Sequence, residues 1–174
     1  MASHGAHSEA GMAAMAHEML ARPAHQLRVL VGGLGAGHTL RAALDLPGVT
    51  EVVVAEIGAK VVEWNRAYFA AVNGHAVDDP RVTVRVADLA DVLRDSPNAF
   101  DLLLLDVDNG PGWLAAPGNA ALYESSGVLT CRDALRPGGV LAVWSPQPNP
   151  TFYATLQTIF PAAEQIDTTS LGKP

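Results

Sequence analysis

The stretch from Leu27 to Glu56 constrains the fold of this chain more than any other. Its sequence, LRVLVGGLGAGHTLRAALDLPGVTEVVVAE, gives an apolar strand, a glycine-rich turn, a helix, and a second apolar strand that ends in a carboxylate. This order is half of a nucleotide-binding α/β sheet, in which glycines let a ligand approach the backbone N–H groups of the turn. The acid at the end of the second strand can accept hydrogen bonds from both hydroxyls of a ribose. We therefore expect a bound cofactor of the adenosine type.

Short apolar runs and helical patterns alternate along the rest of the chain. The predicted strands are 27–31, 51–56, 82–86, 101–106 and 140–144. The predicted helices are 11–22, 37–46, 59–73, 89–94, 119–135 and 151–160. Such alternation predicts an α/β fold with a doubly wound, mostly parallel sheet. We expect residues 1–10 to be a flexible N-terminus and residues 11–174 to form a single domain.

The composition fits a globular domain and disfavours several classes of function. Apolar residues make up 49% of the 174 residues and charged ones 17%, which suits a packed core rather than disorder. The formal charge of −7 disfavours nucleic acid as a partner, since phosphate neutralisation needs clustered Lys and Arg. We expect no membrane span, because no apolar run reaches the ~20 residues that one needs.

The single cysteine and the N-terminus bear on the compartment. Cys131 alone cannot form an intrachain disulfide, and it is expected to pack inertly among apolar residues of a helix. The N-terminus shows no basic region followed by an apolar core, so no secretory signal is expected. Together these features predict a cytoplasmic protein.

The glycine turn and the acid that follows it form the first candidate ligand site. Gly33, Gly35 and Gly37 are expected to let the cofactor approach the backbone of the turn. Glu56 follows the turn by ~20 residues, which is the spacing of an acid that binds ribose hydroxyls, and Ile57 beside it is a further expected contact. The alternative is that Glu56 is a solvated acid at the end of a strand.

Asp88 and Leu89 follow the third predicted strand and are candidates for the adenine end of the same ligand. A carboxylate at Asp88 can accept a hydrogen bond from the adenine amino group. The alternative is that Asp88 caps the helix over 89–94, and both roles can hold at once. Because ligands of open α/β sheets bind beyond the carboxyl ends of the strands, we expect these residues to meet there.

The loop after the fourth predicted strand, DVDNGPGW, gathers two carboxylates and an amide above the sheet. Asp106 and Asp108 are the candidate catalytic residues, because a carboxylate here can orient an amine and take its proton during attack on an electrophile. Asp106 is also expected to touch the cofactor, and Asn109 and Trp113 are expected to line the substrate pocket. The alternative is a turn in which Asp and Asn side chains bond their own backbone.

His17, on the first predicted helix, is a candidate substrate-binding residue that would lean over the pocket. A surface pair with Glu18 is the alternative interpretation. No metal site is expected, because His4 and His7 lack nearby carboxylate or Cys partners in the sequence.

The stretch from His17 to Trp144 resembles the catalytic domain of the spermidine synthases, which are polyamine aminopropyltransferases. The motifs that carry the resemblance are HEML, VLVGGLGAG, VVVAEIGAKVVEWNR, DPRVTVRVADLADVL, FDLLLLDVDNGPG and LYESSGVLTCRDALRPGGVLAVW. The resemblance implies the Rossmann-like fold of class I methyltransferases that use S-adenosylmethionine (SAM). It also implies that Glu56 binds the ribose, that Asp88 binds the adenine, and that Asp106 lies near the acceptor nucleophile.

The chain also departs from the pattern of that family. Gly35 stands where the family's glycine motif commonly has an Asp that holds the aminopropyl ammonium of decarboxylated SAM. Asn109 stands where a second Asp holds the polyamine, Ala16 replaces a Tyr, and the family's N-terminal β-hairpin domain has no counterpart. Losing two charge-assisted hydrogen bonds would weaken diamine binding by ~10²–10⁴.

These departures lead to a prediction of the reaction and its alternatives. We expect SAM as the donor and transfer of an alkyl group, most simply methyl, from its sulfonium to a nucleophile on a small molecule, for example an amine. One alternative is a spermidine synthase-type aminopropyltransferase that uses decarboxylated SAM. Another is a non-catalytic or cyclase-like relic of the fold.

The last predicted elements suggest self-association. Residues 163–168 have the pattern of one more strand, and the antiparallel strand that usually closes such a sheet does not follow. An exposed sheet edge invites pairing with another chain, so we expect a homodimer.

Overall fold

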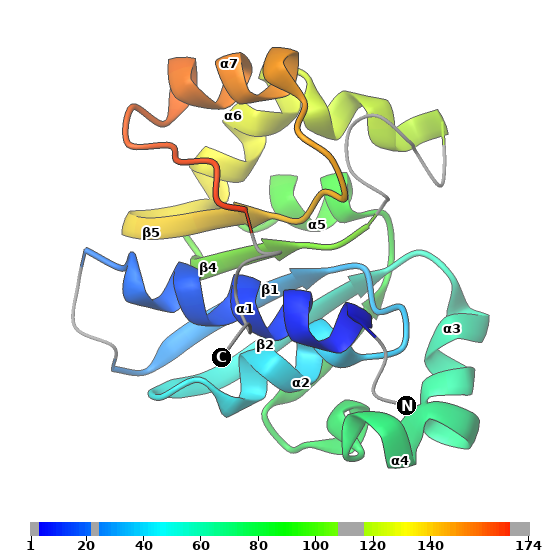
Figure 1. Cartoon of the computed structure of the whole chain (residues 1–174). Helices are drawn as coiled ribbons and strands as arrows, with labels where there is room; N and C mark the ends of the chain where they lie inside the picture. The colour runs from blue at the N-terminus through cyan, green and yellow to red at the C-terminus, as the bar shows by residue number, and fades with distance from the viewer. Residues whose placement is uncertain (1–3, 22–24, 108–116, 168–174) are drawn as a thin grey trace.

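The computed structural model describes residues 4–21, 25–107 and 117–167, and a five-stranded sheet lies at its centre (Figure 1). The strands are β1 (Leu27–Gly32), β2 (Val49–Glu56), β3 (Val82–Val86), β4 (Phe100–Leu105) and β5 (Leu135–Val143). Their order across the sheet is β3-β2-β1-β4-β5, and every neighbouring pair is parallel. The order reverses between β1 and β4, which confirms the predicted doubly wound α/β class.

Helices cover both faces of this sheet. They are α1 (His4–Glu18), α2 (His38–Asp45), α3 (Ala59–Trp64), the π-helix η1 (Asn65–Phe69), α4 (Ala70–Asn73), the 3-10 helix η2 (Ala76–Asp78), α5 (Leu89–Arg94), the 3-10 helix η3 (Pro117–Tyr123), α6 (Ser125–Ala134) and α7 (Pro150–Ile159). One core cluster packs α1 and α2 against the sheet, and a second packs α5 and α6 against the opposite face. Among the described helices, none has the length and apolarity of a bilayer span.

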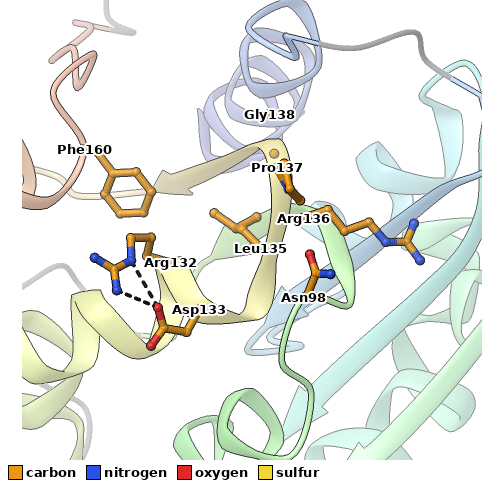
Figure 2. Close-up of a pocket in the computed structure, with 9 residues that line it drawn as sticks. Asn98, Arg132, Asp133, Leu135, Arg136, Pro137, Gly138 and Phe160 are labelled. Carbon is orange, nitrogen blue, oxygen red and sulfur yellow. Dashed lines mark hydrogen bonds and ion pairs between the residues drawn. The ribbon is translucent and has the colours of Figure 1, made fainter.

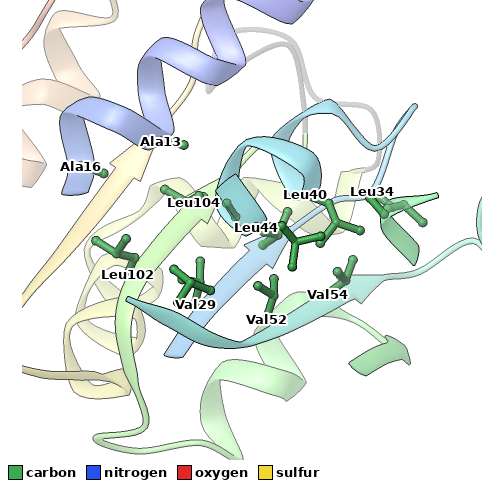
Figure 3. Packing of buried hydrophobic residues seen from close by; sticks show 14 of the residues in the cluster. Ala13, Ala16, Val29, Leu34, Leu40, Leu44, Val52, Val54, Leu102 and Leu104 are labelled. Carbon is green, nitrogen blue, oxygen red and sulfur yellow. The ribbon is translucent and has the colours of Figure 1, made fainter. Parts of the chain in front are cut away.

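The strand β4 shows why its sequence is a continuous apolar run. Leu102 and Leu104 lie in the first core cluster, whereas Leu103 and Leu105 lie in the second. Since both faces of the strand are covered, no position along it is left for a polar side chain facing water. Figure 3 shows the first face, where alanines of α1 and leucines of α2 pack over valines of β1 and β2.

Cys131 belongs to the second core cluster. The side chain is buried in α6, and burial raises the pKa of its thiol to about 12. A thiol that stays protonated at neutral pH is a poor nucleophile, which supports the predicted packing role.

The elements at the two ends of the chain differ from the prediction. α1 begins at His4 and ends at Glu18, whereas the pattern predicted residues 11–22, so residues 4–10 are helical and the flexibility of residues 1–10 stays a prediction. Residues 163–167 form no strand, so the prediction of a further strand is wrong as far as residue 167. The Tyr153 hydroxyl donates to the carbonyl of Ala163 (3.2 Å) and holds the start of this segment against α7.

Three interior boundaries also differ. The predicted helix over 119–135 is divided into η3 and α6, because Glu124 has an extended backbone (φ −85°, ψ 166°). The predicted helix over 59–73 contains the π-helix η1. β5 begins at Leu135 rather than at residue 140, since Arg136 pairs with Asp101 of β4 (3.0 Å) and keeps the RPGG segment beside that strand.

Because all five strands run in the same direction, their carboxyl ends lie along one side of the sheet. β1 leads there into the glycine turn, and β2 ends there with Glu56. β3 and β4 are followed on the same side by Asp88 and Asp106. The fold therefore gathers the acids that the sequence singled out.

Candidate functional site

The glycine turn joins β1 to α2 and packs tightly on the chain that follows β4. Gly33 has φ +85°, and a Cβ atom there would lie 2.4 Å from the carbonyl oxygen of Asp106. The N–H of Gly37 donates to the carbonyl of Leu34 (2.7 Å), which closes the turn. Only glycine combines the left-handed conformation with this close approach, so the turn is placed directly beside the backbone of Asp106.

Glu56 links the end of β2 to this turn. Its side chain is only 9% exposed, and its Oε2 accepts a hydrogen bond from the N–H of Leu34 (2.9 Å). Its Oε1 accepts a second one from the N–H of Gly58 (2.7 Å). A carboxylate offers about four acceptor positions, so two remain for a ligand. Glu56 is therefore an oriented acceptor, and the alternative of a solvated acid does not describe it.

A small hollow of ≈ 70 Å³ lies at the carboxyl ends of the strands. It is lined by Gly33, Ala55, Glu56, Ile57, Ala87, Asp88, Leu89, Val107 and Asn119. Five of the residues predicted to bind the cofactor thus line one hollow: Gly33, Glu56, Ile57, Asp88 and Leu89. The side chain of Ile57 is 69% exposed, and such an apolar surface beside a hollow suits packing against a ring.

Asp88 caps α5, as one of the two interpretations of the sequence predicted. Its Oδ1 accepts a hydrogen bond from the N–H of Ala90 (2.8 Å). The other carboxylate oxygen has no hydrogen bond among the described residues and belongs to a side chain that lines the hollow. The cap fixes the carboxylate, and its binding to an adenine amino group stays a prediction.

Asp106 follows β4 and is held by two contacts. Its N–H donates to the carbonyl of Gly32 (2.9 Å), and its Oδ2 accepts a hydrogen bond from the hydroxyl of Thr39 (2.8 Å). Burial raises the pKa of the Asp106 carboxyl, while the Thr39 hydrogen bond and the nearby His38 oppose that rise. A carboxylate with a raised pKa and an oriented second oxygen is suited to accept a proton.

Sequence reasoning did not single out Thr39, although it is buried in the first turn of α2. The only signal was its position two residues after the last glycine of the turn. Asn119 and Val107 also line the hollow and carried no sequence signal.

The structure does not bring every predicted residue to the site. Nε2 of His17 lies 3.1 Å from the carbonyl oxygen of Pro47, in the loop before β2. That loop is at the amino ends of the strands, so His17 lies at the other end of the sheet from Glu56. Gly35 is at the exposed tip of the turn. Asp108, Asn109 and Trp113 lie outside the described residues.

A larger pocket of ≈ 450 Å³ lies at the amino end of β5 (Figure 2). Its arginines already have partners: Arg132 pairs with Asp133 (2.7 Å), and Arg136 pairs with Asp101 (3.0 Å). None of the acids that gather at the carboxyl ends lines it. We therefore assign the candidate site to the smaller hollow.

Comparison with known proteins decides the family. The model of the spermine/spermidine synthase domain matches residues 9–158, which is most of the chain. The chain belongs to the spermine/spermidine synthase family. This confirms the resemblance seen in the sequence, and it agrees with the parallel sheet and the glycine turn described above.

Individual relatives of the family agree with this assignment. A polyamine aminopropyltransferase of Prochlorococcus marinus is 32% identical over 135 residues, which are 77% of this chain and 46% of that protein. The spermidine synthase of Thermotoga maritima has a TM-score of 0.65 and 28% identity, covering 83% of this chain and 50% of that one. The chain thus spans about half the length of such relatives.

The fold is shared beyond the synthases. Human methyltransferase-like protein 13, solved in complex with SAH, has a TM-score of 0.63 and 26% identity, covering 91% of this chain and 72% of that one. The Rossmann-like class I methyltransferase fold implied by the resemblance is thereby confirmed. The fold alone does not separate the two kinds of transfer.

Proposed function

We propose that this chain is the nucleoside-binding and catalytic part of an aminopropyltransferase that moves the aminopropyl group of decarboxylated SAM to an amine. Membership of the spermine/spermidine synthase family and the similarity to polyamine aminopropyltransferases support the proposal. The comparisons favour this reaction over the methyl transfer from SAM that the sequence departures predicted. The aminopropyl alternative therefore becomes our principal hypothesis.

The observation that carries the proposal is the unbalanced charge of the site. Glu56 and Asp88 line the hollow, and Asp106 follows β4 at the same side of the sheet, against Gly33. In the described part of the chain none of these acids pairs with a Lys or Arg. Three carboxylates without a Lys or Arg partner attract positively charged ligands. A sulfonium donor with an ammonium tail and an amine acceptor have that charge.

Within this proposal, each acid has a separate role. The two remaining acceptor positions of Glu56 hold the ribose hydroxyls, and Ile57 packs on the face of the adenine. The second oxygen of Asp88 accepts a hydrogen bond from the adenine amino group. These roles place the sulfonium end of the ligand beside the glycine turn and Asp106, because Gly33 of the turn lines the hollow and lies against the carbonyl of Asp106.

Asp106 acts on the acceptor. The amine nitrogen attacks the carbon next to sulfur, so that a C–N bond forms and the C–S bond breaks. The electron pair of the C–S bond stays on sulfur and leaves a neutral thioether, 5′-methylthioadenosine. Asp106 orients the amine and accepts the proton that the nitrogen loses, and Thr39 holds one carboxylate oxygen while the other faces the acceptor.

Methyl transfer remains the rival, and one observation favours it. Gly35 offers no carboxylate to an aminopropyl ammonium at the exposed tip of the turn. A donor that keeps its own carboxylate, as SAM does, would then not be repelled by a second carboxylate at this position.

One experiment separates the candidates. The protein is incubated with putrescine and either decarboxylated SAM or SAM, and the nucleoside products are identified by mass spectrometry. Our proposal predicts 5′-methylthioadenosine and spermidine from decarboxylated SAM. S-adenosylhomocysteine formed from SAM alone would establish methyl transfer instead. Absence of product from both donors would support the non-catalytic alternative.

A further inference from the structure

Two buried asparagines join the tip of the glycine turn to the helical segment formed by α3, η1 and α4. Asn65 and Asn73 are each 1% exposed. Nδ2 of Asn65 donates to the carbonyl of Gly35 (2.8 Å), and Nδ2 of Asn73 donates to the carbonyl of Ala36 (3.1 Å). The two side chains are also bonded to each other, from Nδ2 of Asn73 to Oδ1 of Asn65 (2.8 Å). We call Asn65 and Asn73 the amide clamp.

The π-helix explains how both members of the clamp reach the turn. Eight residues along a regular α-helix correspond to a rotation of about 80° beyond two full turns. Asn65 and Asn73 would then project from different faces. The π-helix η1 begins at Asn65 and takes up an extra residue, so that the effective separation is near seven residues and the mismatch falls to about 20°. The irregular helix therefore aligns the two amides.

The clamp controls the orientation of two peptide groups. In a trans peptide the C=O and the following N–H point in opposite directions. With the Gly35 carbonyl held by Asn65, the N–H of Ala36 points away from the helical segment. With the Ala36 carbonyl held by Asn73, the N–H of Gly37 points the other way and donates to Leu34 (2.7 Å). Neither peptide can flip without losing these bonds.

Gly37 is part of the same arrangement. Its φ is +85°, and a Cβ atom there would lie 2.5 Å from Nδ2 of Asn73 and 2.8 Å from Oδ1 of Asn65. A side chain at position 37 would thus push the clamp away from the turn. The turn in its clamped form also presents the N–H of Leu34 to Glu56 (2.9 Å) and Gly33 to the hollow.

We propose that Asn65 and Asn73 are positioning residues that hold the glycine turn ready for the nucleoside. The ligand in this proposal rests on the proposed function, whereas the effect on the turn does not. The clamp touches no reacting atom. It acts through the turn and, by way of Leu34, through the carboxylate of Glu56.

The test uses isosteric variants. Asn65→Asp and Asn73→Asp keep the shape of the side chain but replace the donating NH₂ group with an oxygen that repels the carbonyl. Asn149→Ala is the control. It removes the hydrogen bond that the side-chain oxygen of Asn149 accepts from the N–H of Phe152 (3.0 Å) at the start of α7, away from the turn. Hydrogen exchange of residues 33–37 and the affinity for 5′-methylthioadenosine are measured for each variant.

We expect exchange in the turn to rise about tenfold or more in both Asp variants and to stay unchanged in the control. The affinity should fall about fivefold to tenfold for each Asp variant, because each variant loses one hydrogen bond to the turn itself. The loss of binding free energy in the double variant should not exceed the sum of the losses in the two single variants, since the two amides act as a unit.

Each other outcome counts against part of the account. Folded Asp variants with unchanged exchange and unchanged affinity would overturn the clamp. A loosened turn with unchanged affinity would overturn its role in ligand binding. If the wild-type protein binds no 5′-methylthioadenosine, the proposed function fails and the clamp is judged by exchange alone. If an Asp variant does not fold, the Ser variant at the same position, whose shorter side chain does not span the distance to the turn, is measured in its place with the same expected rise in exchange.

Discussion

The two ends of the parallel sheet use the same residue types for different purposes. At the amino ends, acids lie beside arginines. Asp101, which is 0% exposed, accepts hydrogen bonds from the N–H of Arg28 (2.7 Å) and from Nη1 of Arg136 (3.0 Å). Nε of Arg28 in turn lies 2.9 Å from Oε2 of Glu51. This cluster fastens β1, β2, β4 and β5 to one another.

At the carboxyl ends, the acids contact the backbone and a hydroxyl instead of cations. Glu56 accepts from two N–H groups, Asp88 from one, and Asp106 from the hydroxyl of Thr39. These contacts orient each carboxylate without neutralising it. The comparison teaches that an acid fixed in place but left without a counter-charge is available to a ligand, whereas an acid paired with arginine serves the fold.

The largest expected effect is on catalysis, from Asp106→Asn. Turnover with decarboxylated SAM and an amine should fall by ~10²–10⁴, because the variant keeps the shape of the side chain but loses its charge and its ability to take a proton. The dissociation constant for 5′-methylthioadenosine, measured by calorimetry, should change little. Stability at pH 7 should be equal or higher, since burial raises the pKa of this carboxyl and so disfavours its ionised form in the fold.

The matched change at the other end of the same strand is Asp101→Asn. This variant should lower the free energy of unfolding by about 2–4 kcal/mol, because Arg136 and the N–H of Arg28 lose a charged, buried acceptor. Urea unfolding would measure the loss. The folded fraction should keep wild-type turnover. Lost turnover with normal stability would mean that the two ends are not functionally distinct.

Glu56→Ala should have a smaller effect on affinity. Binding of 5′-methylthioadenosine should weaken about thirtyfold, or ~2 kcal/mol, because the ribose loses a charged acceptor. The N–H groups of Leu34 and Gly58 lose their acceptor as well, so the free energy of unfolding should separately fall by ~1–2 kcal/mol. Titration calorimetry and urea unfolding separate the two effects. Unchanged affinity would remove Glu56 from the site.

The smallest expected effect is a shift of the pH profile in Thr39→Val. Turnover requires the ionised carboxylate of Asp106, so it should be present above the raised pKa of that group and decline as the pH falls through it. The Thr39 hydroxyl stabilises the ionised form, and its removal should move this decline to higher pH by about half to one unit. Thr39→Ser retains the hydroxyl and serves as the control. An unmoved profile in the valine variant would show that Asp106 is not the titrating base.

The sequence predicts the scaffold well because periodic patterns and local chemistry specify it. The apolar run of β4, the glycines of the turn and the acids that follow β2, β3 and β4 are all local signals, and the parallel sheet brings them together. The same motifs carry the resemblance to the spermidine synthases, which the family comparison confirms. The ends of elements were predicted less well. Glu124 is extended and divides the predicted helix over 119–135, and the start of β5 depends on the pairing of Arg136 with Asp101, which is distant in sequence.

Contacts made across the fold could not be predicted. Thr39 is distant in sequence from Asp106, and Asn65 and Asn73 are distant from the turn that they hold. Their roles follow from packing and from a π-helix that no simple period reveals. The predicted position of His17 over the pocket was wrong for the same reason. The direction in which α1 crosses the sheet is a tertiary property, and it places His17 beside Pro47. The homodimer and the cytoplasmic location stay predictions.

The most direct test of the account is a calorimetric titration of the protein with decarboxylated SAM and with SAM under identical conditions. The acids at the carboxyl ends have no Lys or Arg partner among the described residues, so they should favour the donor without a carboxylate. We predict that decarboxylated SAM binds about tenfold more tightly or better, a difference of ~1.4 kcal/mol. Equal or tighter binding of SAM would contradict the proposed function and restore methyl transfer as the reaction of this site.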